Sequence, residues 1–294
     1  MLLIFPILIG GPIMNNQILT PEQISAYAAY LRSEERAAAT VNKYLRDITV
    51  FAAWLGGRPV TKEAAAQWKA ELLDMGQAPA TINAKLSAIN GLFQFYGWND
   101  CRVKFLKVQR KIFRDSAREL TKEDYNRLRE TALNLSLDWL ALLMEAICST
   151  GVRVSEVRYI TVEAALAGRT DVSLKGKIRS IILPNKLCRK LLKYAKRKKI
   201  ASGAIFRTAD GAELSRFQIW KAMKDLAEEA GVEASKVFPH NLRHLFATTF
   251  YRATRDIVKL ADVLGHSSIN TTRIYLLTTG EEHAREVESL GLVS

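Results

Sequence analysis

Apolar residues recur at helical spacing through the first third of the chain, and turn-forming residues break the pattern at regular intervals. Thr20-Pro21-Glu22 has the form of an N-cap, a proline in the first turn and an acid that complements the helix dipole. The predicted helices run from Pro21 to about Arg32, from near Thr40 to Gly56, from after Thr61 to Gly76, and from after Pro79 to near Gly97. Short connections between four helices predict a small all-α bundle.

The pattern becomes mixed in the second part of the chain, where further helices surround a short stretch of strand periodicity. Residues 171–175 and 178–183 alternate on either side of Gly176-Lys177 and predict a β-hairpin. Helices are predicted from Thr121, over 138–149, 185–199 and 215–230, and then through the segment 239–275; a last short amphipathic helix is predicted over 281–293. The fold class is therefore mainly α with a small hairpin.

A basic segment without clear periodicity, residues 102–114, separates these two regions and reads as a linker. We predict a helical domain over about 15–114, including this linker, and a second domain over about 119–294 with a C-terminal helix. Arg110, Lys111 and Arg114 make the linker cationic, as expected of a segment that contacts DNA; an ordinary solvated connection is the alternative.

Residues 1–13 are apolar, but Pro6, Gly10, Gly11 and Pro12 interrupt them, and they are too short to span a bilayer. We interpret residues 1–14 as an unstructured extension with Met14 as the true start; a weak membrane anchor is the alternative. The three cysteines are widely spaced, which suits a reducing cytoplasm.

The net charge of +13 and the isoelectric point of about 9.7 point to a polyanionic partner, most commonly nucleic acid. The predicted helix over 185–199 carries eight Lys or Arg and no acid, which favours a phosphate-facing surface over a merely solvated one. The second and fourth helices share the opening Ala-Thr-x-Asn followed by a lysine. Thr40, Lys43, Thr81 and Lys85 are thus candidates for DNA contact, with simple N-capping by the threonines as the equal alternative.

Residues Pro239 to Tyr275 hold the candidate chemistry. His240 and Arg243 are three apart and would project from one helical face. Gly265-His266 should end one helix, and Ser267-Ser268 should cap another that carries Tyr275. Guanidinium groups match phosphoryl oxygens, and a phenol can act as nucleophile if its neighbours stabilise charge.

Other chemistries lack their motifs. The chain has no G-x-x-x-x-G-K-[ST] loop for ATP or GTP and no G-x-S-x-G elbow. His240 and His244 have the spacing of a zinc protease pair, but Asn241 stands where the catalytic Glu would be. We therefore expect no metal and no cofactor.

Several motifs agree in order: T-G-V-R-V-S-E, a lysine in the hairpin, P-H-N-L-R-H, L-G-H-S-S and T-T-R-I-Y. This series resembles the tyrosine recombinase (phage-integrase) family over about Leu120 to Tyr275, and the preceding helices are similar to its SAM-like core-binding domain. The length of the chain is similar to that of Xer-type enzymes.

The resemblance implies roles for individual residues. It implies Tyr275 as a nucleophile that forms a 3′-phosphotyrosyl bond. It implies Arg153 and Arg243 as phosphate ligands, with Glu156 as a support for Arg153. It also implies His240 and His266 as hydrogen-bonding and proton-transfer groups. Lys175 is the preferred general acid, and Lys177 in the same hairpin is the alternative.

The resemblance also implies a site-specific DNA recombinase that needs neither nucleotide nor metal, clamps double-stranded DNA and works as a homo-tetramer on two sites. It further implies a nucleoid-associated enzyme in the cytoplasm, with an accessory DNA-bending or directionality factor as a possible partner. Integration or excision of a mobile element is our preferred role. The alternatives are Xer-type chromosome dimer resolution, a type IB topoisomerase-like activity and a catalytically silent DNA-binding protein.

Overall fold

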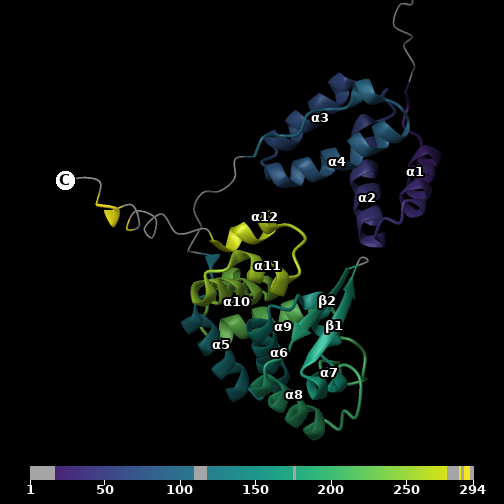
Figure 1. Cartoon of the computed structure of the whole chain (residues 1–294). Coiled ribbons are helices and arrows are strands. Elements are labelled where there is room, and N and C mark those ends of the chain that lie inside the picture. The colour runs from purple at the N-terminus through teal and green to yellow at the C-terminus, as the bar shows by residue number, and fades with distance from the viewer. Residues whose placement is uncertain (1–16, 109–117, 175–176, 277–284, 286–287, 292–294) are drawn as a thin grey trace, which may run out of the picture. The chain divides into compact units, whose positions relative to one another are not determined.

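The computed structural model describes residues 17–108, 118–174, 177–276, 285 and 288–291. The chain divides into two compact units, Met1–Arg110 and Lys111–Ser294, each with its own core (Figure 1). The predicted extension over 1–14, the linker residues Arg110, Lys111 and Arg114, and most of the predicted tail helix lie outside the described residues.

The first unit is helical: α1 Pro21–Ser33, α2 Ala38–Leu55, α3 Lys62–Asp74, α4 Pro79–Phe95 and the short 3-10 turn η1 Asn99–Cys101. Local capping explains two of the starts, because the side chains of Thr20 and Thr61 accept hydrogen bonds from backbone N–H groups three residues on. Phe51, Leu86 and Phe93 are fully buried at its centre.

The N-capping explanation for Thr40 and Thr81 is wrong. The caps of α2 and α4 are Ala37 and Ala78, without side-chain bonds, so each threonine is the third helical residue. The shared opening has a different structural use in α4, where the Asn83 side chain donates to the Leu106 carbonyl at 2.9 Å and accepts from the Leu106 N–H at 2.8 Å.

Asn90, seven residues further along α4, makes the same two-way bond with Val103, at 2.9 and 3.1 Å. Asn83 and Asn90 are seven residues apart on α4, a rise of about 10.5 Å. Val103 and Leu106 are three residues apart in extended chain, which spans about 10 Å. The two pairs therefore have the same spacing. The first part of the predicted linker, residues 103–106, is therefore held along α4 by side-chain amides instead of running free.

The second unit begins with α5 Lys122–Asn134, α6 Asp138–Thr150, the 3-10 helix η3 Val154–Tyr159 and α7 Val162–Ala167. The antiparallel strands β1 Arg169–Leu174 and β2 Lys177–Ile182 follow, and then α8 Asn185–Arg197 and α9 Arg216–Glu229. The 3-10 turn η4 Ala234–Lys236 leads to α10 Pro239–Thr254, α11 Ile257–Leu264, α12 Ile269–Thr272 and the 3-10 turn η5 Arg273–Leu276. The predicted class, mainly α with a small β-hairpin, is confirmed.

The hairpin turn lies one residue earlier than predicted. Leu174 pairs with Lys177, so Lys177 belongs to β2, and Lys175-Gly176 form the connection, outside the described residues. The alternation of residues in the sequence does not show where each strand ends. The end is decided by which residues pair across the two strands, and here that register brings Lys177 into β2.

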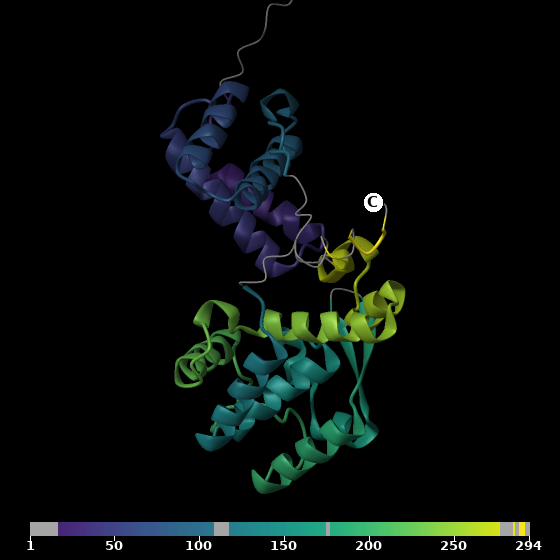
Figure 2. The same cartoon turned by 90° about the vertical axis from the view of Figure 1, so that its left-hand side faces the viewer.

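Helix α6 is the centre of the second unit, with Leu140, Leu143 and Ile147 fully buried. It packs against α5, α8 and α10. In both views α10 runs across one end of this unit and α8 lies at the opposite end (Figures 1 and 2). Helix α6 ends at Gly151, whose left-handed φ of 65° turns the chain toward Arg153 at the α10 end.

Candidate active site

Arg243 is the buried centre of the predicted constellation. It lies one turn after His240 on α10 and is 2% exposed, whereas His240 is exposed. Its Nη1 donates to the Gly151 carbonyl, and its Nη2 donates to the Leu264 carbonyl at 2.8 Å and contacts His266 Nε2 at 3.0 Å. One side chain thus joins the ends of α6 and α11.

Burial, and after it the charge of the nearby Arg153, lowers the pKa of Arg243 to about 10, although the charge of the Tyr275 side chain and a hydrogen bond to it oppose the shift. A depressed arginine pKa means that the surroundings compensate the positive charge incompletely. An anion placed beside this guanidinium would be stabilised.

His266 follows the left-handed Gly265 that ends α11. Its Nδ1 lies 2.9 Å from the hydroxyl oxygen of the buried Thr272. Because a guanidinium can only donate, His266 Nε2 must accept from Arg243, which leaves the proton on Nδ1 for Thr272. Burial, followed by the charges of Arg243 and Arg153, lowers the pKa of His266 to about 4, so the ring is neutral at pH 7.

Arg153 precedes η3, and its side chain is 39% exposed. Its Nη1 donates to Glu156 Oε1 at 2.7 Å, and its backbone N–H donates to Oε2 at 2.8 Å. Its Nη2 lies 3.4 Å from the Gly265 carbonyl oxygen. Arg153 therefore remains accessible from solvent while the buried Glu156 holds one of its ends.

Tyr275 stands on the 3-10 turn η5 and not on the capped helix, since α12 ends at Thr272. It is 3% exposed and packs with Ala247, Leu260 and Leu264. Its ring centroid lies 5.0 Å from that of His244 and 6.1 Å from that of His266. The phenol is thus packed among the predicted site residues.

The structure brings Arg153, His240, Arg243, His266 and Tyr275 together. A contact or a charge effect links each of the other four residues to Arg243. Although His240 is exposed at the surface, partial desolvation of its ring, and then the charge of Arg243, lowers its pKa. Lys175 lies outside the described residues, and Lys177 is placed by its backbone in β2.

Three neighbours of the site were missed from the sequence. Thr272 binds His266, Glu119 Oε1 lies 3.3 Å from His244 Nε2, and Arg179 on β2 binds Glu156. Arg179 stands beside the candidate lysines in the hairpin, which was the only sequence feature that could have drawn attention to it.

The candidate DNA-contact residues of the first unit are partly accessible. Thr81 is exposed, and Thr40, Lys43 and Lys85 are half-buried. Lys43 Nζ pairs with Asp47 Oδ2 at 2.5 Å. Thr40 and Tyr44 of α2 line a cavity together with Ser87, Gly91 and Gln94 of α4. The beginning of α2 therefore lies beside the C-terminal half of α4 and not beside the first turn of α4.

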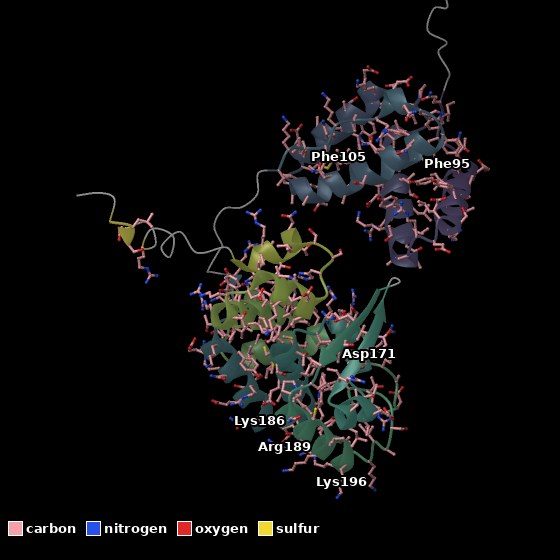
Figure 3. All side chains as sticks on the ribbon, in the orientation of Figure 1. Phe95, Phe105, Asp171, Lys186, Arg189 and Lys196 are labelled. Carbon is pink, nitrogen blue, oxygen red and sulfur yellow. The ribbon has the colours of Figure 1, made fainter. Side chains whose placement is uncertain are left out.

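The cations of α8 lie at the end of the second unit away from α10–α12, as Lys186, Arg189 and Lys196 show in Figure 3. Lys190 pairs with Glu145 at 2.6 Å, and Arg197 with Asp138 at 2.6 Å. This basic helix is separate from the candidate active site.

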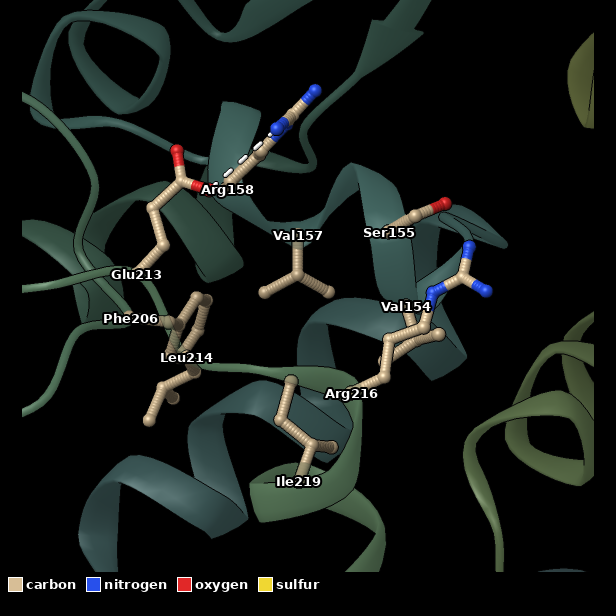
Figure 4. A pocket seen from close by; sticks show the side chains of 9 residues that line it. All are labelled: Val154, Ser155, Val157, Arg158, Phe206, Glu213, Leu214, Arg216 and Ile219. Atoms are coloured by element: carbon tan, nitrogen blue, oxygen red, sulfur yellow. Dashed lines mark ion pairs between the residues drawn. The ribbon is translucent and has the colours of Figure 1, made fainter. Parts of the chain in front are cut away.

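A cavity of about 230 Å³ opens beside η3, next to Arg153 in the sequence (Figure 4). Val157, Phe206 and Ile219 form apolar walls. Arg158 pairs with Glu213 at 3.6 Å, while the Arg216 guanidinium and the Ser155 hydroxyl point to the same side. The cavity is a mixed apolar and cationic recess and holds none of the predicted catalytic side chains.

Among the described residues, no group of three or more His, Cys, Asp or Glu is arranged to hold a metal ion. Within the same part of the chain, no helix has both the length and the apolar character needed to cross a bilayer.

Comparison with known families agrees with the motif series. The model of the phage integrase family matches residues 118–282, which include the whole arginine, histidine and tyrosine cluster. The chain belongs to the phage integrase family. Residues 24–99 match the N-terminal SAM-like domain of phage integrases. The predicted recognition of a tyrosine recombinase, and of the SAM-like fold of its first unit, is confirmed.

The chain is similar to tyrosine recombinase XerA of Pyrococcus furiosus, with 28% identity over 288 residues that cover 95% of this chain and 98% of the relative. It is 35% identical to tyrosine recombinase XerD of Mycobacterium leprae over 150 residues, 47% of each chain. These family matches confirm the predicted reaction class, site-specific DNA recombination.

Solved structures share the fold. A lambda integrase tetramer bound to a Holliday junction aligns with a TM-score of 0.72 and 19% identity, over 89% of this chain and 78% of that one. The XerH recombinase in a post-cleavage complex with its difH substrate aligns with a TM-score of 0.70 and 18% identity, over 92% and 84%.

Proposed function

We propose that this recombinase cuts DNA by attack of the Tyr275 oxygen on a scissile phosphodiester. The phosphorus forms a bond to that oxygen, the bond from phosphorus to the 5′-oxygen breaks, and a 3′-phosphotyrosyl link and a 5′-hydroxyl result. Attack by a 5′-hydroxyl on the phosphotyrosine reverses these steps and rejoins DNA. The phosphotyrosyl bond retains the energy for religation, so the chemistry needs no nucleotide.

One observation carries this proposal: the excess of buried positive charge beside the phenol. Arg153 and Arg179 both pair with one buried carboxylate, Glu156, and the charges of both arginines also act on the buried guanidinium of Arg243. These three arginines and Glu156 together carry two net positive charges, and the imidazoles of His240 and His266 beside them are neutral. A phosphodiester, and still more its pentavalent transition state, would supply the missing negative charge.

The roles follow from this geometry. Arg153, partly exposed, and Arg243, behind it, would hold the non-bridging oxygens. His240 and His266, both neutral because their pKa values are lowered, would hydrogen-bond the phosphate, and the more exposed His240 would accept the phenol proton. Lys175 would protonate the leaving 5′-oxygen.

The nucleophile is tested on a duplex with a nick beside the cleavage site, where loss of the short product traps the covalent adduct. Tyr275→Phe should bind this DNA and form no adduct. Tyr251→Phe is the matched control, because Tyr251 packs in the same cluster and has no assigned role; it should form the adduct at the wild-type rate. An adduct with Tyr275→Phe would show that another residue attacks.

The proposal extends to the partner and the assembly. Double-stranded DNA would be clamped by both units, with the linker and the residues Thr40, Lys43, Thr81 and Lys85 contacting its backbone. Strand exchange would be carried out by a homo-tetramer bound to two recombination sites. The enzyme would act in the cytoplasm at the nucleoid, with an accessory DNA-bending or directionality factor as a further partner.

Movement of a mobile element stays our prediction for the biological role. Chromosome dimer resolution is the alternative with an observation in its favour, since the relative matched over 98% of its length is a Xer recombinase. Sequencing covalent protein–DNA junctions recovered from cells separates the two: junctions at element ends support the first, and junctions at a single chromosomal site support the second.

A further inference from the structure

Arg179 is a third guanidinium at the candidate site, and it joins three separate parts of the second unit. Its side chain is 10% exposed and stands on β2. Its Nη2 donates to Glu156 Oε2 at 2.7 Å, and its Nη1 donates to the Val263 carbonyl at 3.2 Å. The β-hairpin, η3 and the end of α11 therefore meet at one side chain.

Gly265 shows how closely the end of α11 rests on Arg179. Its φ of 62° lies in the left-handed region, and a Cβ at this position would overlap Arg179 Cδ. Only glycine permits both the backbone conformation and this approach. The Gly265 carbonyl oxygen lies 3.4 Å from Arg153 Nη2. Arg179 therefore packs against the residue whose carbonyl faces Arg153.

Glu156 is shared between the two arginines. It is 1% exposed, and its Oε1 accepts from Arg153 Nη1 while its Oε2 accepts from Arg179 Nη2. A buried carboxylate needs compensation at both oxygens. With Arg179 removed, the obvious replacement is the second Nη of Arg153, because carboxylate and guanidinium favour a two-pronged contact.

That two-pronged contact would turn Arg153 Nη2 away from substrate; in this structure Nη2 lies at the exposed end of the side chain, 3.4 Å from the Gly265 carbonyl oxygen, with Nη1 alone on the carboxylate. We propose that Arg179 is a positioning residue for strand cleavage, which occupies Glu156 so that Arg153 binds the carboxylate through one Nη and presents the other to the scissile phosphate. This inference rests on the proposed function, in which Arg153 holds a non-bridging oxygen.

Burial, the largest effect, lowers the pKa of Arg179, and Glu156 opposes that shift. The charge of Arg179 also contributes to the lowered pKa values of Arg243 and His266. The side chain thus adds to the positive environment without itself being open to substrate.

The test measures single-turnover cleavage and DNA affinity separately, with the full-length chain and the nicked duplex. Arg179→Gln should slow cleavage by roughly 10²-fold, the usual effect of misplacing a catalytic group by about 1 Å, with little change in Kd. Arg179→Lys should not restore the rate, because an ammonium on a flexible stem cannot bind Glu156 and the Val263 carbonyl in the same geometry. Arg169→Gln, an exposed arginine on the paired strand β1, is the matched control and should cleave normally.

A double-variant cycle distinguishes action through Glu156 from general damage. If Arg179 acts through Glu156, Arg179→Gln combined with Glu156→Gln should lose no more activity than the worse single variant. Fully additive losses, wild-type cleavage by Arg179→Gln, or a loss of DNA affinity alone would overturn the proposal. If Arg179→Gln does not fold, Arg179→Lys, which keeps the buried charge, carries the same cycle.

Failure of the proposed function is distinguishable from failure of this inference. If the wild-type protein forms no adduct that depends on Tyr275, the proposed function fails. If it forms that adduct and Arg179→Gln forms it equally fast, only the positioning role of Arg179 is wrong.

Discussion

His266 is held as a neutral ring by two fixed partners, one donor and one acceptor. Arg243 Nη2 lies 3.0 Å from its Nε2, and Thr272 Oγ1 lies 2.9 Å from its Nδ1. Protonation of Nε2 would place two donors face to face beside three guanidinium groups. This arrangement accounts for the direction of the pKa shift, since burial and the charges of Arg243, Arg153 and Arg179 all act against the imidazolium form.

The titration of His266 follows from this environment. In the DNA-free protein its imidazole resonances should titrate near pH 4 instead of near 6.5, and the nitrogen shifts should show the Nδ1–H form at neutral pH. Between those pH values the unfolded chain binds a proton that the folded chain does not, so this residue should lower the free energy of unfolding as the pH falls from 6.5 toward 4. Arg179→Gln, which removes one cation, should raise the midpoint. A midpoint near 6.5 in the wild-type protein would contradict the assigned contacts.

At the scale of single elements, the two candidate general acids occupy different positions along the β-hairpin. The register Leu174–Lys177 places Lys175 in the connection between the strands and Lys177 within β2. Lys175 stays our prediction for the general acid, with Lys177 as the alternative.

Chemistry can isolate the general acid. Lys175→Ala should cleave an ordinary phosphodiester roughly 10²–10⁴-fold more slowly than wild type. A 5′-bridging sulfur substrate has a leaving group that needs little protonation, so cleavage by this variant should largely recover. Lys177→Ala should show neither the defect nor the recovery. Recovery of Lys177→Ala instead would assign the acid to β2, and recovery of neither would direct attention to His240 and His266.

The elements themselves could be predicted where their determinants are local. Thr20, Thr121 and Ser215 bond to backbone N–H groups three residues on, so their caps are visible in sequence. Thr40 and Thr81 have the same residue type without that geometry, because their helices begin earlier.

The main residues of the candidate site could be predicted from the sequence, but the residues that hold them in place could not. Its arginines, histidines and tyrosine stand in recognisable motifs. Arg179 instead gains its role from Gly265 and Val263, more than eighty residues away, and this proximity exists only after packing. The burial of Tyr275 likewise depends on how η5 folds back onto α10 and α11.

At the scale of the whole molecule, charge and chemistry together constrain the assembly. The net charge of +13 provides attraction to DNA that weakens with salt and does not depend on base sequence. The proposed mechanism is more restrictive, because each protomer would contribute one Tyr275. Exchange of strands between two duplexes would require both strands of each to be cut, so the proposal calls for four tyrosines and hence four protomers.

The assembly can be measured with Tyr275→Phe, which should bind DNA without cutting it. Mixed with duplexes that carry the cleavage site recovered from cells, the protein should form a particle of four 33.0 kDa chains and two duplexes by mass photometry. Duplexes of equal length without the site are the control: they should bind at low salt with no fixed stoichiometry and release as salt rises, because only phosphate contacts hold them. A single chain on each cognate duplex at every protein concentration would instead support the topoisomerase-like alternative, in which one tyrosine cuts and reseals one strand of the same duplex.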